Sequence, residues 1–115
     1  MNNFNQAEFA CPCCGGNDIR AEAVERLQKA RTIAGTPFRI TSGWRCEKHN
    51  KAEGGKATSS HMLGWAFDIA CETSVMRFNL LEALQRAGFN RFGIGKTFIH
   101  TDCDPNKPQH MIWVY

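Results

Sequence analysis

Two histidines and one aspartate, divided between residues 59–68 and 98–102, have the residue types of a metal centre. Two imidazoles and one carboxylate leave one position of a tetrahedral zinc ion open, where a water molecule can be activated as a nucleophile. The sequence therefore predicts a hydrolytic site with one zinc ion per chain, held by His61, Asp68 and His100.

The residues around Asp68 alternate in polarity, as they do in a half-buried strand. The larger side chains of residues 65–70 are predicted to face the core: Trp65, Phe67 and Ile69. Asp68 then shares the opposite face with two alanines, which leave room for a metal and a substrate. Gly64 lets the chain turn tightly, so that His61 can return over Asp68.

A second strand is predicted for residues 98–102, where the same alternation places His100 and Asp102 on one face. Asp102 is therefore a candidate for the general base. It is equally a candidate for a hydrogen-bond acceptor that orients His100.

The segment from Ser59 to Asp68 reads Ser-x-His-x-x-Gly-x-Ala-x-Asp, and a histidine on an apolar stretch follows further on. This pattern resembles the zinc D-Ala-D-Ala carboxypeptidase and endolysin family of murein peptidases, peptidase M15. The small form of that family carries Thr-Ser-Gly-Trp-Arg and His-Asn before the first ligand, here residues 41–45 and 49–50. The resemblance covers roughly residues 4–104.

The resemblance implies zinc binding by the two histidines and the aspartate, and substrate contacts by Arg45 and Ser59. It implies cleavage of peptide bonds in peptidoglycan stem peptides, by a carboxypeptidase or by an endolysin-type endopeptidase. In several relatives an acid lies three residues before the last ligand, where this chain has Thr97. The base must then come from elsewhere, and Asp102 is the candidate.

The roles of Arg45 and Ser59 can also be argued from their residue types. The planar guanidinium of Arg45 suits bidentate capture of a peptide carboxylate, which makes it a candidate catalytic and substrate-binding residue. Ser59 either contacts substrate or bonds the backbone of its own turn.

A non-catalytic role is the main alternative to hydrolysis. The fold implied by the resemblance is shared with the signalling domain of hedgehog proteins, which binds rather than hydrolyses. A phage structural protein that grips the cell wall would likewise need no base. The absence of an acid at position 97, where this chain has Thr97, favours the first of these alternatives, a zinc domain that binds without hydrolysis.

Composition limits the remaining possibilities. The 115 residues, 43% hydrophobic and 22% charged, predict one soluble domain over residues 1–115, with residues 1–17 as an irregular arm. A net charge of +3 is too small to indicate nucleic acid, and no apolar run is long enough for a membrane. We expect a monomer without a signal peptide, made in the cytoplasm and acting on the cell wall, in the periplasm or delivered by a phage.

The elements that must position the site follow from hydrophobic spacing. A helix is predicted from Asp18 to Gly35 and another from Thr73 or Ser74 to Gly88, the latter with a buried stripe of Met76, Leu80, Leu84 and Ala87. Strands are predicted at residues 38–41, 65–70, 98–102 and 111–115, with a loop at 46–60 and a glycine-rich turn at 92–95. The order predicts an α+β fold, in which a small, mainly antiparallel sheet packs against two main helices.

Six cysteines complete the inventory. Residues 11–15, Cys-Pro-Cys-Cys-Gly, look like half of a zinc knuckle, but the second half is not evident in the sequence. Reduced, packed thiols or a local disulfide are therefore favoured over a second metal.

Overall fold

The structure is a computed structural model that describes residues 4–115. In chain order its elements are η1 (Gln6–Phe9), α1 (Ala21–Ala34), β1 (Ile40–Ser42), α2 (Glu47–Ala52), β2 (Ala66–Ala70), α3 (Ser74–Arg86), β3 (Arg91–Ile94), β4 (Phe98–Asp102) and β5 (Met111–Val114). No helix within residues 4–115 is both long and apolar enough to span a membrane.

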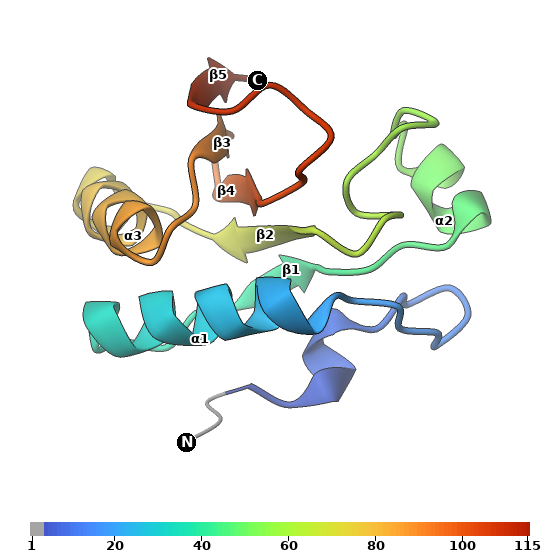
Figure 1. Ribbon diagram of the computed structural model, residues 1–115, viewed down its shortest axis with the longest axis horizontal. Helices are drawn as coiled ribbons and strands as arrows, with labels where there is room; N and C mark the ends of the chain where they lie inside the picture. Colours follow the sequence, from blue (N-terminus) through green and yellow to red (C-terminus); the bar gives the residue numbers. More distant parts are fainter. Residues whose placement is uncertain (1–3) are drawn as a thin grey trace.

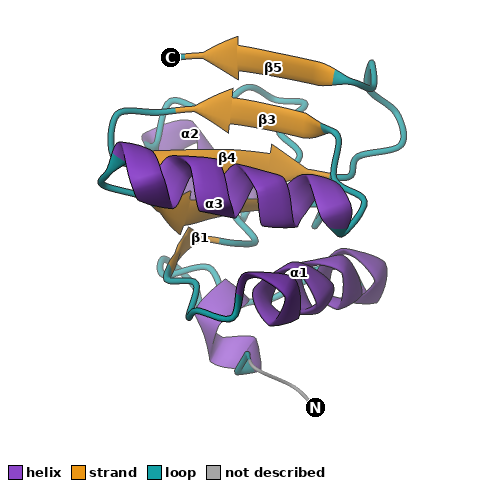
Figure 2. Cartoon of the chain, turned by 90° about the vertical axis from the view of Figure 1, so that its left-hand side faces the viewer, coloured by secondary structure: helices purple, strands orange, loops and turns teal. Residues whose placement is uncertain are grey.

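The strands form one sheet in the order β1-β2-β4-β3-β5. Neighbouring strands are antiparallel, except that β3 and β5 are parallel. In Figure 1, β5 lies at the edge of the sheet farthest from α1. Figure 2 shows α3 in front of the strands and α2 behind them. The predicted α+β class with a mainly antiparallel sheet is confirmed.

The helix α1 ends at Gly35 and α3 begins after Thr73, as the sequence predicts, whereas α1 begins at Ala21, three residues after the predicted Asp18. Gly35, with a φ of 70°, caps α1 in the left-handed conformation, which glycine adopts without a Cβ penalty. The Thr73 hydroxyl accepts a hydrogen bond from the Met76 backbone and so caps α3. The predicted stripe of α3 is wrong at Met76, which is 48% exposed, because the start of the helix, with Ser74 and Val75, is exposed on all sides.

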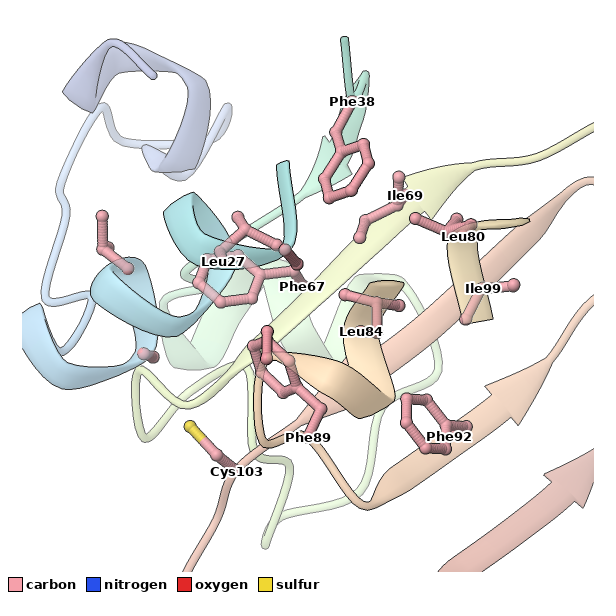
Figure 3. Packing of buried hydrophobic residues seen from close by; sticks show 14 of the residues in the cluster. Leu27, Phe38, Phe67, Ile69, Leu80, Leu84, Phe89, Phe92, Ile99 and Cys103 are labelled. Atoms are coloured by element: carbon pink, nitrogen blue, oxygen red, sulfur yellow. The ribbon is translucent and has the colours of Figure 1, made fainter. Parts of the chain in front are cut away.

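The hydrophobic core lies between the helices and one face of the sheet (Figure 3). The helices α1 and α3 contact each other there. Their buried leucines pack with the core-facing side chains of β2 and β4: Leu27, Leu80, Leu84, Phe67, Ile69 and Ile99. Since alternate residues of a strand point to opposite faces, Asp68 and His100 project from the other face.

Three local predictions differ from the structure. The predicted loop at 46–60 contains α2, a six-residue helix capped by the Cys46 sulfur. Residues 92–95, predicted as a turn, lie mostly in β3, because the chain there pairs with strands on both sides. The arm contains the 3-10 helix η1, whose Phe9 is fully buried against the core.

Candidate metal centre

The predicted ligands meet on the sheet face opposite the core. Asp68 of β2 and His100 of β4 are directly paired across the antiparallel ladder. His61 comes from the turn before β2, where Gly64 has a φ of 83° and packs against the Asp18 carbonyl. A Cβ there would lie 2.3 Å from that oxygen, so only glycine allows the turn that returns His61 to the sheet.

The donor atoms of the three residues converge on one point. The Oδ1 atom of Asp68 lies 3.2 Å from His61 Nε2 and 3.0 Å from His100 Nδ1. Tetrahedral ligands at zinc distances of 2.0–2.2 Å are separated by about 3.3 Å. Both imidazoles are buried and Asp68 is nearly so. The spacing and chemistry of these three residues therefore fit a bound divalent metal.

Each imidazole is also fixed through its second nitrogen. His61 Nδ1 donates to the Gly43 carbonyl at 2.8 Å, and His100 Nε2 donates to Asp102 Oδ2 at 2.8 Å. Metal-binding histidines are held in this way, because a hydrogen bond at the distal nitrogen sets the tautomer and the ring orientation. The nitrogens that face Asp68 are thus the ones left for a metal.

Asp102 is fully engaged in these contacts. Its second oxygen, Oδ1, accepts from Arg91 Nε at 2.7 Å and from the Asp104 backbone at 3.2 Å. Burial would raise the pKa of Asp102, but the hydrogen bond from His100 and the nearby Arg91 charge lower it. A buried, ionised carboxylate that is bonded at both oxygens suits the orienting role predicted for Asp102. No motif in the sequence indicates its partner, Arg91.

Electrostatics at the centre favour a charged network in the metal-free chain. Burial would raise the pKa of Asp68, but hydrogen bonds from His100 and His61 hold it well below its usual range. Burial would lower the pKa of His100, but its hydrogen bonds with Asp102 and Asp68 raise it above 6.5. In the metal-free chain, protonated His100 and ionised Asp68 thus stabilise each other. A bound metal would take the place of the imidazole proton that faces Asp68.

This network predicts a pH dependence for the chelator-treated protein. The raised pKa of His100 means that its contacts stabilise the metal-free fold fully below pH 6.5, and that this stabilisation is lost as the pH rises through the raised value. Metal binding requires a neutral imidazole, so metal affinity should weaken as the pH falls through the same value. NMR titration of the imidazole C–H resonances tests this directly. A pKa of His100 at or below 6.5 in the metal-free protein would contradict the prediction.

Arg45 and Ser59 both lie at the metal centre, with internal partners. Arg45 donates to Asp68 Oδ2 at 3.3 Å and to the Ser42 hydroxyl at 3.0 Å. The Ser59 hydroxyl accepts from the backbone N–H of His61 at 3.2 Å, which is the turn contact predicted as its alternative role. Both residues also line the cleft above the ligands.

This cleft has a volume of about 620 Å³. Its far wall includes Trp113 and Tyr115 from the C-terminal end of the chain, which sequence reasoning did not connect with the site. Gly93 pairs with both His100 and Trp113, and a Cβ on it would lie 2.5 Å from the indole nitrogen. The glycine therefore allows the Trp113 ring to lie 5.6 Å from the His100 ring.

Other candidate groups lie outside the cleft or at its rim. Thr97 lines a neighbouring hollow, and its carbonyl accepts from Cys71. His49 also lines that hollow, and its Nε2 lies 3.5 Å from Glu53. Among the described residues, three carboxylates line the cleft: Glu53, Asp68 and Asp102.

Comparison with models of known protein families gives a match over most of the chain. A family model described as Peptidase M15 matches residues 2–104, which is most of the chain. No curated protein sequence matches closely enough to count as a relative.

Proposed function

Because this chain belongs to the peptidase M15 family, and is therefore of the metallopeptidase kind, we propose that it is a zinc enzyme that hydrolyses peptide bonds in bacterial peptidoglycan stem peptides. The observation that carries the proposal is the convergence of His61, Asp68 and His100 on the floor of an open cleft. Two imidazoles and one carboxylate leave a position for water, as hydrolytic zinc sites require.

Zinc in this position would lower the pKa of a bound water to about 7 and polarise the scissile carbonyl. The chain's own residues supply the remaining requirements. The Gly43 carbonyl and Asp102 hold the two imidazoles in the tautomers that face Asp68. A carboxylate in the cleft accepts the proton of the attacking water and returns it to the leaving amine.

Substrate recognition is assigned to Arg45 at the cleft wall. Its side chain is mostly buried and lines the cleft, where it already contacts one carboxylate, Asp68. The cleft also contains Lys56 and Lys107. A cationic wall suits stem peptides, which carry free carboxylates. Ser59 also lines the cleft, where its hydroxyl can add a hydrogen bond to substrate.

The test is hydrolysis measured with two substrates and a chelator. A synthetic peptide that ends in D-Ala-D-Ala reports carboxypeptidase activity, and purified murein reports endopeptidase activity. We expect at least one to be cleaved, activity to disappear with chelator, and activity to return with zinc. If neither is cleaved by zinc-loaded protein, the enzyme proposal fails, and murein binding without cleavage would support a cell-wall-binding domain.

Arg45→Ala is expected to raise KM by about tenfold or more with a smaller change in kcat, because a carboxylate clamp acts equally in the ground and transition states. Arg39→Ala, at an exposed arginine just before β1, is the matched control and should behave as wild type. Metal content should be unchanged in both variants. Loss of the metal in Arg45→Ala would show that the arginine chiefly positions Asp68.

A further inference from the structure

Four of the six cysteines gather at a second place in the fold, away from the cleft. Three come from the arm, at Cys11, Cys13 and Cys14, and the fourth is Cys46 at the start of α2. The Cys11 and Cys46 sulfurs are 3.6 Å apart, and those of Cys11, Cys14 and Cys46 all lie within 4.8 Å of one another. In Figure 1 the arm runs beside the chain that enters α2.

The backbone around these cysteines holds the sulfurs in place. Cys11 and Gly16 close a tight turn, since the Cys11 N–H donates to the Gly16 carbonyl at 2.8 Å. Gly15 in that turn has a φ of 72°, which favours glycine. Backbone N–H groups also donate to two sulfurs, from Gly16 to Cys14 and from His49 to Cys46, each at 3.4 Å. Such bonds stabilise the thiolate form that binds metals.

We propose that Cys11, Cys14 and Cys46 bind a second, structural zinc ion, with Cys13 as the fourth sulfur. The Cys-x-x-Cys spacing of the arm is that of a zinc knuckle, and Cys46 is the missing half. Zinc–sulfur distances of about 2.3 Å place tetrahedral sulfurs about 3.8 Å apart, close to the separation of Cys11 and Cys46. Cys13 lies between Cys11 and Cys14 in the arm, and its exposed thiol makes it the candidate for the fourth ligand.

The position of this cluster explains what such an ion would do. The arm is already joined to the segment before α2, because Trp44 donates to the Phe9 carbonyl at 2.8 Å. Gly43 packs so closely on Phe9 that a Cβ there would lie 2.7 Å from the Phe9 backbone. The same short segment supplies the Gly43 carbonyl that orients His61, and it also carries Arg45. A zinc ion bound by Cys46 and the arm cysteines would hold the end of this segment that leads into α2, while Phe9 holds its beginning.

Metal content of protein purified under reducing conditions tests the proposal. We expect two zinc ions per chain in the wild type, one in Cys46→Ser and in Cys14→Ser, and one in His61→Ala. Cys14 is exposed, so its replacement leaves the core intact if Cys46→Ser fails to fold. Cys71→Ser, at a buried cysteine outside the cluster, is the control and should keep two.

Cobalt substitution identifies the ligands independently of activity. In His61→Ala, bound cobalt should show a sulfur-to-metal charge-transfer band that disappears when Cys14→Ser is added. Cys13→Ser should lose cobalt to a chelator faster than wild type, and equal retention would remove Cys13 from the set. One zinc ion per wild-type chain, with the cluster thiols freely reactive or joined in a disulfide, would overturn the proposal without affecting the peptidase site.

Discussion

His61→Ala is expected to remove the metal from the cleft and to abolish hydrolysis. Loss of a hydrogen-bond partner behind a metal ligand costs about 10–100-fold in metal affinity. Loss of one of three ligands should cost more, because it also leaves the nearly buried Asp68 with fewer partners. Metal analysis should find one ion fewer per chain than in the wild type, and added zinc should not restore activity.

The control for this variant is His110→Asn, at an exposed histidine that does not line the cleft. His110 has a φ of 60°, and asparagine tolerates this left-handed conformation. The control should keep both metal and activity. Wild-type metal content in His61→Ala would refute the ligand assignment, since the remaining pair would then bind as well as the full set.

The parts of the fold that depend on local patterning were predictable. The alternation around Asp68 and His100 placed both side chains on one sheet face, and the ladder pairs them directly. The spacing of apolar residues up to Gly35 predicted the first helix, because an amphipathic stripe and a left-handed cap both depend on residues that are close in the sequence. Such features need no knowledge of distant contacts.

Features created by distant contacts were not predictable in the same way. Gly93 suggested a turn, whereas it leaves space for Trp113, a residue on a strand that pairs from far along the chain. No sequence feature around Cys46 indicates that its sulfur lies close to the Cys-x-x-Cys cysteines of the arm. Arg91 has no motif around it, and only the pairing of β3 with β4 brings it beside Asp102.

The two possible roles of Asp102 predict different results for Asp102→Asn. A general base contributes about 10²–10⁴-fold to turnover, so its loss would lower kcat with metal retained and remove the acidic limb of the pH profile. An orienting carboxylate would instead lower metal affinity, and excess zinc would restore much of the turnover. The contacts favour the second result, because both oxygens of Asp102 are already occupied by His100 and Arg91.

We therefore expect Asp102→Asn to bind zinc about 10–100-fold more weakly, with turnover within a few-fold of wild type at saturating zinc. The matched variant is Glu53→Gln. Among the described carboxylates of the cleft, only Glu53 has a side chain that is more than half exposed and has no contact with the metal ligands. If Glu53 is the base, its variant should keep zinc and lose about 10²-fold or more in kcat. A large kcat loss in Asp102→Asn at full zinc occupancy, with Glu53→Gln fully active, would return the base role to Asp102.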